Sequence, residues 1–149
     1  MAGMATANWW KDWRFGVAML AACLYWAVLL LVEGRQPDWA WPLRAPRVAL
    51  YAALLYPVAE ELVFRGLLQE LAARHLRAWR LGPLTHANVY TSLLFTGLHF
   101  INHPPLWAAA VFVPSLIFGY FRDRTGGVGA PIVLHVWYNT GYFWLFTTA

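Results

Sequence analysis

Five apolar stretches, separated by short segments that hold most of the charge, constrain this chain more than any other feature. The stretches cover residues 14–32, 48–73, 84–101, 106–121 and 128–148. A helix of about 20 apolar residues crosses the hydrocarbon layer of a bilayer. Only 12% of the residues are charged, about half the fraction of a soluble domain. We therefore predict an all-α, polytopic membrane bundle of about five transmembrane helices, in which residues 1–149 form a single domain.

Charge and cysteine content exclude several other classes of protein. The formal net charge is +4, and the basic residues form no dense run, so the chain lacks the signature of a nucleic-acid-binding protein. The single cysteine, Cys23, cannot form an intramolecular disulfide, and its apolar surroundings predict a packing role. The first stretch has no small-residue cleavage site before Glu33, so we interpret it as a retained transmembrane helix and not as a signal peptide.

The positions of the basic residues predict the orientation in the membrane. With a cytoplasmic N-terminus, seven lie in inner segments and three in outer ones. The inner residues are Lys11, Arg14, Arg74, Arg77, Arg80, Arg122 and Arg124, and the outer ones are Arg35, Arg44 and Arg47. Because cytoplasmic segments are enriched in Lys and Arg, we expect the N-terminus inside and the C-terminus outside. Ten arginines beside one lysine are typical of a GC-rich bacterial genome, which indicates a bacterial inner membrane.

Six polar residues lie inside the apolar stretches, where the composition disfavours them. They are Glu60, Glu61, Arg65, His99, His135 and Asn139. An ionisable group at the bilayer centre costs roughly 2.5–3.5 kcal/mol on insertion scales, so each of these groups needs a partner or a function.

The sequence EELVFR at 60–65 places two of them on one helix face. Glu61 and Arg65 are four residues apart, which allows an ion pair. Glu60 is rotated by about 100° from Glu61 and is expected to point at another helix, either as a general base or as a helix–helix hydrogen-bonding group. Pro57, one turn earlier, is expected to kink the helix and free a backbone carbonyl.

The histidines fall into two groups. FTGLH at 95–99 and HVWYN at 135–139 put His99 on the third stretch, and His135 with Asn139 on one face of the fifth. His75, His86 and His103 lie at or near the ends of stretches, and we interpret them as interfacial or solvated.

One reaction would use these groups together. Glu60 would take a proton from a water that His99 orients, the water would attack a peptide carbonyl, and His135 and Asn139 would donate hydrogen bonds to the oxyanion. Three alternatives stay open at this point. Glu60, His99 and His135 could bind zinc, the two histidines could ligate haem or contact a quinone, or the bundle could be a non-enzymatic adaptor or immunity protein.

Together, the three motifs resemble the CPBP family of CAAX prenyl endopeptidases and bacteriocin-processing proteins, also called Abi. The family pattern is E-E-x-x-x-R, then F-x-x-x-H, then H-x-x-x-N, on successive membrane helices. The resemblance covers about residues 48–145 and leaves the first stretch outside.

The resemblance implies an intramembrane glutamic endopeptidase. We expect no cofactor, with zinc as the alternative. Glu60 and His99 would activate water, His135 and Asn139 would stabilise the oxyanion, and Glu61 with Arg65 would support them. The implied partners are the lipid bilayer and a protein or peptide substrate in the membrane. The chain is much shorter than eukaryotic members and is similar to short bacterial ones, so we expect a bacteriocin-type, C-terminal sorting-tag or CAAX-like substrate.

Straight helices would not bring these residues together. At about 1.5 Å per residue, Glu60 would lie near mid-membrane, His99 near the outer end of its helix and His135 nearer the inner end. A shared site therefore predicts tilted or interrupted helices, with breaks at Pro57, Pro114 and residues 126–131.

Overall fold

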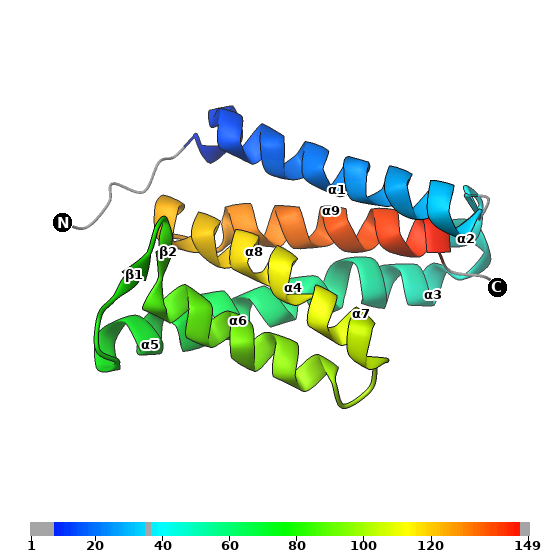
Figure 1. Cartoon of the computed structure of the whole chain (residues 1–149). Helices are drawn as coiled ribbons and strands as arrows, with labels where there is room; N and C mark the ends of the chain where they lie inside the picture. The colour runs from blue at the N-terminus through cyan, green and yellow to red at the C-terminus, as the bar shows by residue number, and fades with distance from the viewer. Residues whose placement is uncertain (1–7, 35–36, 147–149) are drawn as a thin grey trace.

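The computed structural model describes residues 8–34 and 37–146 and is mainly helical, with very little strand, which confirms the all-α prediction. Its long helices are α1 (Trp13–Glu33), α6 (His86–His99), α8 (Phe112–Thr125) and α9 (Gly129–Phe146). Shorter elements are η1 (Trp9–Lys11), α2 (Trp41–Arg44), α7 (Pro105–Ala110) and an antiparallel hairpin of β1 (Arg80–Leu81) and β2 (Leu84–Thr85). In Figure 1, α9 runs through the middle of the bundle beneath α1, and α6 lies on the opposite side.

The second apolar stretch forms one helical run in which α-helical and π-helical turns alternate. It consists of α3 (Pro46–Val48), η2 (Ala49–Leu55), α4 (Tyr56–Glu61), η3 (Leu62–Leu68) and α5 (Gln69–His75), where η2 and η3 are π-helical. The motif residues Glu60 and Glu61 therefore lie between two wide turns. Such turns occur frequently at functional sites, because they redirect side chains without ending the helix.

Local signals explain where the long helices begin and end. Asp12 caps α1 by accepting a hydrogen bond from the Arg14 N–H, and Thr85 caps α6 through the Asn88 N–H. Gly34 and Gly126 end α1 and α8 in the left-handed conformation, with φ of 63° and 71°, which glycine adopts without steric cost. The predicted break at residues 126–131 is thus the turn between α8 and α9, and Pro114 lies in the first turn of α8, just after the end of α7.

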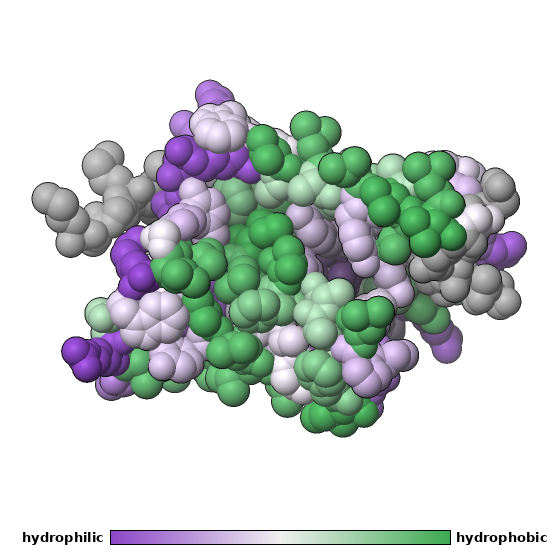
Figure 2. Space-filling view, viewed as in Figure 1, coloured by the Kyte–Doolittle hydropathy of each residue, from purple (hydrophilic) through white to green (hydrophobic). Residues whose placement is uncertain are grey.

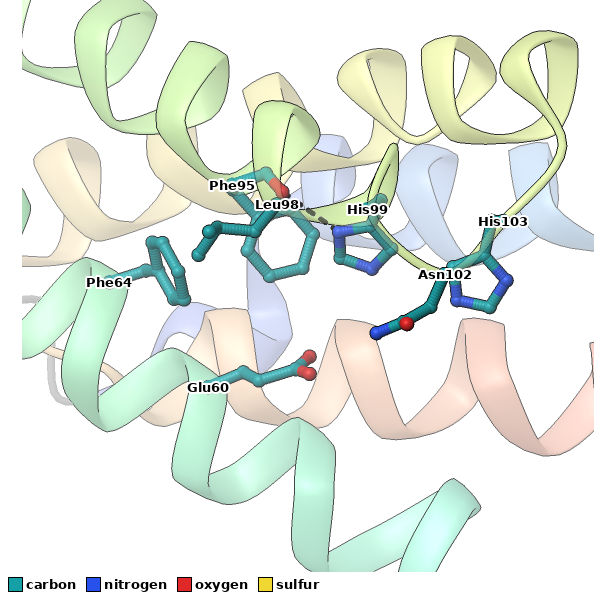
Figure 3. Close-up of a pocket in the computed structure, with 7 residues that line it drawn as sticks. All are labelled: Glu60, Phe64, Phe95, Leu98, His99, Asn102 and His103. Carbon is teal, nitrogen blue, oxygen red and sulfur yellow. Dashed lines mark hydrogen bonds between the residues drawn. The ribbon is translucent and has the colours of Figure 1, made fainter.

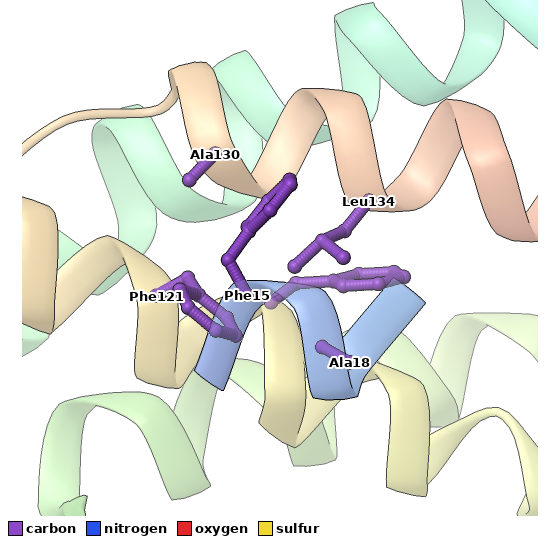
Figure 4. Packing of buried hydrophobic residues seen from close by; sticks show 6 residues of the cluster. Phe15, Ala18, Phe121, Ala130 and Leu134 are labelled. Atoms are coloured by element: carbon purple, nitrogen blue, oxygen red, sulfur yellow. The ribbon is translucent and has the colours of Figure 1, made fainter. Parts of the chain in front are cut away.

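Three helices meet in the main apolar core. Figure 4 shows Phe15 and Ala18 of α1 packed against Phe121 of α8 and against Ala130 and Leu134 of α9. A second cluster centres on Ala22 and Trp26 of α1, and Cys23 packs at its edge, as predicted. Helix α9 contacts α1, α8 and the run through η2 and α4, and α6 packs on α8 and α5, so the motif-bearing helices form one body.

Apolar side chains also cover much of the outside of the bundle. Leu20, Leu24 and Leu31 of α1 are each at least two-thirds exposed, whereas Glu61 and Arg65 are fully buried. Figure 2 shows hydrophobic residues over most of the visible face and hydrophilic residues mainly toward its ends. This arrangement suits a protein whose flanks face lipid and whose interior holds polar groups.

Within the described residues, two helical segments are long and apolar enough to cross a membrane, Trp13–Val32 and Pro105–Thr125. The other three of the five predicted spans stay predictions. Helix α6 shows the reason, because its 14 residues extend only about 21 Å, less than the roughly 30 Å of a hydrocarbon layer.

Candidate active site

Glu60 and His99 line the same pocket, as the shared-site hypothesis requires. The pocket has a volume of about 190 Å³ and lies between α4–η3 on one side and the end of α6 on the other. In Figure 3, the Glu60 carboxylate reaches into this space from α4, opposite the His99 ring. Phe64, Phe95 and Leu98 form an apolar wall beside these two residues. The structure therefore places a carboxylate and an imidazole at one small cavity.

The backbone of its own helix fixes the tautomer of His99. The Nδ1 atom of His99 lies 2.8 Å from the carbonyl oxygen of Phe95, one turn earlier. A carbonyl oxygen can only accept a hydrogen bond, so Nδ1 carries the hydrogen in this contact. In the neutral ring, Nε2 is then left as an acceptor. The spacing of four residues in FTGLH thus prepares His99 to accept a hydrogen bond from water.

His135 lies between the two carboxylates of the EELVFR motif. Its Nδ1 is 2.8 Å from Glu61 Oε1, and its Nε2 is 3.6 Å from Glu60 Oε2. The His135 ring stacks on Phe118 and meets the edge of Phe95, so its orientation is set by packing as well as by Glu61. The prediction that Glu60 points at another helix is confirmed.

Glu61 is fully buried and is paired with Arg65, as the spacing predicts. The Nε atom of Arg65 is 3.3 Å from Glu61 Oε2. Arg65 Nη2 also donates to the carbonyl oxygen and the hydroxyl of Ser115, at 3.0 and 2.8 Å. A buried carboxylate is costly unless it is paired, so Arg65 allows Glu61 to hold His135 in an apolar interior.

Comparison with known proteins places this arrangement in a family. The family model described as type II CAAX prenyl endopeptidase Rce1-like matches residues 42–141, which is about two-thirds of the chain. This chain belongs to the Rce1-like family. The match confirms the resemblance to the CPBP proteins that the three motifs indicated. All six motif residues lie inside the matched range. Rce1-like proteins are membrane-embedded proteases, in agreement with the apolar exterior.

One curated relative has a similar sequence. A protein of Escherichia coli, described only as "Uncharacterized 24.3 kDa protein", is 36% identical over 84 residues. The matched segment is 56% of this chain and 36% of that protein, so the chain corresponds to about a third of the relative's length. No solved structure gives a significant match.

The last motif residue of this Rce1-like chain, Asn139, has a backbone partner outside the pocket wall. Its Nδ2 donates to the carbonyl oxygen of Ala52 at 3.1 Å. The N–H of Tyr56 bonds to Tyr51 five residues back, so in the same π register the next N–H would bond to Ala52. Residue 57 is proline and has no N–H. The contact of Asn139 with Ala52 agrees with the prediction that Pro57 frees a carbonyl, and Asn139 as an oxyanion donor stays a prediction.

Two residues that line the pocket were not predicted as site residues from the sequence. Asn102 and His103 line the cavity together with Glu60 and His99. His103 was expected to be interfacial or solvated. It is exposed, but its ring also stacks on His99 and packs at a tilt against Trp107, with centroid distances of 5.7 and 4.1 Å. Partial desolvation where its ring lines the pocket lowers the pKa of His103, and the nearby His99 lowers it further. Their spacing of three and four residues after His99 was the available signal.

The other two histidines at the ends of the apolar stretches differ from each other. His75 is exposed, as predicted. His86 is buried, with Nε2 3.2 Å from the carbonyl oxygen of Ala72, so its prediction as an interfacial or solvated residue is wrong. The reason is tertiary packing, because α5 folds back against the start of α6.

The metal hypothesis concerns Glu60, His99 and His135. Within residues 8–34 and 37–146, no three or more His, Cys, Asp or Glu side chains are grouped as metal ligands would be. The zinc set, and haem or quinone binding through the two histidines, stay hypotheses that need chemical analysis.

Proposed function

We propose that this chain is an intramembrane endopeptidase that hydrolyses a peptide bond of a membrane-associated protein or peptide. One observation carries the proposal: the Glu60 carboxylate and the His99 imidazole face each other across a pocket with room for water. Because Nδ1 of His99 is engaged by Phe95, its Nε2 can orient a water molecule toward Glu60.

The reaction follows from these roles. Glu60 takes a proton from the water as the water oxygen forms a bond to the carbonyl carbon of the substrate. The carbonyl oxygen then carries the negative charge. When the carbon–nitrogen bond breaks, Glu60 delivers the same proton to the leaving amine. One water is consumed, and one carboxyl and one amino terminus are formed.

His135 and Asn139 are the oxyanion donors in this proposal. Glu61 accepts the Nδ1 hydrogen of His135, so donation from Nε2 to an oxyanion requires the imidazolium form. Arg65 offsets the charge of Glu61 and leaves Glu60 as the carboxylate next to Nε2. Preorganised donors of this kind are worth several kcal/mol in a site with little water.

For the membrane we propose five spans, a cytoplasmic N-terminus and the inner membrane of a bacterium. Arg124, at the end of α8, pairs with Asp12 at the start of α1, which brings two predicted inner segments together. The hairpin lies at that end of the bundle in Figure 1, and the loop from α6 to α7 lies at the other. Arg35 of the predicted outer segment lies outside the described residues. The match to a protein of Escherichia coli supports a bacterial origin.

The substrate class follows from the family and from the apolar pocket wall. We propose a C-terminal sorting tag, a bacteriocin-type precursor or a CAAX-like sequence as the cleaved segment. The test uses the purified full chain in detergent with three fluorogenic peptides, one of each class, the CAAX peptide being farnesylated. Mass spectrometry of the products identifies the bond that breaks.

Variants test the roles of the residues. We expect Glu60→Gln and His99→Ala to lose at least 100-fold in kcat/KM while circular dichroism and gel filtration stay unchanged. Glu70→Gln makes the same chemical change on α5, outside the pocket, and should keep full activity. Wild-type activity in Glu60→Gln, or no cleavage of any peptide by the wild type, would contradict the proposal.

The zinc version of the same protease is tested in the same assay. Activity that is lost with a chelator and restored by zinc would favour Glu60, His99 and His135 as metal ligands. Full activity in metal-free protein, verified by elemental analysis, would favour water activated by Glu60 and His99 alone.

A further inference from the structure

Asn102 presents a side-chain amide to the pocket opposite Glu60. Figure 3 shows its carboxamide extending from the segment after α6 into the space between His99 and the Glu60 carboxylate. Within the part of the chain that the structure describes, no side-chain hydrogen bond is formed by Asn102, and the residue is exposed. Both N–H groups and the carbonyl oxygen of this amide are thus available to a ligand.

The backbone holds Asn102 at this position. The N–H groups of Asn102 and His103 both bond to the carbonyl oxygen of His99, at 3.4 and 3.1 Å, and form a tight turn at the end of α6. Pro104 and Pro105 follow and restrict the backbone where α7 begins. The amide is therefore presented one turn beyond His99 from a constrained segment.

The other candidate donors at the site have different surroundings. The Asn139 amide is engaged with the Ala52 carbonyl, and His135 Nε2 faces Glu60. Neither accounts for how an extended substrate is held before water attacks. A carboxamide donates and accepts at once, which matches the N–H and C=O of a peptide backbone.

We propose that Asn102 binds the substrate backbone, by hydrogen bonds to the peptide group next to the scissile bond. The apolar wall of Phe64, Phe95 and Leu98 then receives the neighbouring side chain, so the preferred substrate is an extended segment with an apolar residue beside the cleaved bond. This inference rests on the proposed protease function. The inferred hydrogen bonds hold the substrate equally strongly in the ground state and in the transition state.

Such uniform binding has a kinetic signature. Loss of it raises KM and leaves kcat unchanged, whereas loss of an oxyanion donor lowers kcat. Loss of one or two neutral hydrogen bonds corresponds to about a 5- to 20-fold change in affinity. We therefore expect Asn102→Ala to raise KM about 5- to 20-fold with kcat within about twofold of the wild type.

The experiment measures kcat and KM for Asn102→Ala with the fluorogenic peptide that the wild type cleaves fastest. Asn8→Ala removes an amide at the start of η1, outside the pocket lining, and should leave both constants unchanged. As a binding measurement without turnover, the same peptide is titrated into Glu60→Gln and into the double variant Glu60→Gln/Asn102→Ala, and the double variant should bind about 5- to 20-fold more weakly.

The outcomes separate the two proposals. An unchanged KM in Asn102→Ala, or a lower kcat at constant KM, overturns the role of Asn102 and leaves the protease function standing. Absence of cleavage by the wild type overturns the protease function, and the inference falls with it. A higher KM together with weaker binding by the double variant supports both.

Discussion

The side-chain amide of Asn139 on α9 donates a hydrogen bond to the backbone carbonyl of Ala52 in η2, five residues before Pro57. It lies 3.1 Å from the carbonyl oxygen of Ala52, the acceptor that an N–H at position 57 would reach in the π-helical register. The third motif is thereby joined to the helix that carries the first. Because Pro57 lies one turn before Glu60 and Asn139 one turn after His135, this contact sets the spacing between the two motif-bearing helices.

A double-mutant cycle tests that contact. Asn139→Ala leaves the Ala52 carbonyl unpaired, and we expect it to lower the free energy of unfolding by about 1–3 kcal/mol. In the Pro57→Ala background a backbone N–H can bond to Ala52, so the same Asn139→Ala change should cost clearly less. Thermal unfolding of the four proteins in detergent gives the comparison. Equal losses in both backgrounds would show that Asn139 does not compensate for the proline.

The buried pair of Glu61 and Arg65 predicts a large effect on stability. Arg65→Met leaves the fully buried Glu61 carboxylate without its cationic partner, which should cost about 3–5 kcal/mol in the free energy of unfolding. Adding Glu61→Gln removes the unpaired charge and should recover part of that loss. Denaturation monitored by tryptophan fluorescence measures both variants. If Arg65→Met alone were as stable as the wild type, the view that Arg65 neutralises Glu61 would be wrong.

Gly141 on α9 lies against Trp26 of α1, and Gly97 on α6 offers a glycine control without such a contact. A Cβ at Gly141 would overlap the indole ring of Trp26, whereas a Cβ at Gly97 would meet nothing within 4 Å. Gly141→Ala must displace the indole and should destabilise the fold by about 1–3 kcal/mol. Gly97→Ala should be neutral or more stable by up to about 1 kcal/mol, since alanine favours helices. The melting temperature should therefore fall in Gly141→Ala and stay the same or rise in Gly97→Ala when the two variants are measured side by side.

The ion pair between α1 and α8 predicts a dependence of stability on pH. The hydrogen bond from Arg124 holds the pKa of the Asp12 carboxyl below its usual value. The ionised carboxylate is therefore favoured in the folded state, so its contribution is present above pH of about 4 and is lost as the pH falls through the lowered pKa. Melting temperatures at pH 6 and pH 3 test this. We expect the melting temperature to fall less between the two pH values in Arg124→Gln than in the wild type. Arg80→Gln, on the exposed hairpin, should behave like the wild type.

Periodicity and short-range spacing were sufficient to predict the local features of the site. The apolar stretches became helices, and residues four apart on one helix met, as Glu61 does with Arg65 and His99 with the carbonyl of Phe95. Both contacts depend only on the pitch of the helix. His86 shows the limit of this reasoning, because its burial comes from α5 packing against α6 and not from its own neighbours in the chain.

The depths of the motif residues show the same limit. Counted along straight spans, Glu60, His99 and His135 would lie at different levels in the membrane. In the structure, Glu60 Oε2 is 3.6 Å from His135 Nε2, and Glu60 shares a pocket with His99. The π-helical segments on both sides of α4, the short α6 and the turn at Gly126 bring the three residues together. Hydropathy and spacing carry no information on these offsets between helices.

The sequence by itself determined the all-α class, the family and the six polar residues that stand out in an apolar chain, because burying charge is costly enough to mark them without any coordinates. Only the tertiary structure decided which of these groups face the pocket, that the Asn139 amide bonds to the Ala52 carbonyl, and that Asn102 and His103 complete the wall opposite Glu60. The physical reason is that side-chain spacing fixes contacts within one helix, whereas contacts between helices depend on how their apolar faces pack.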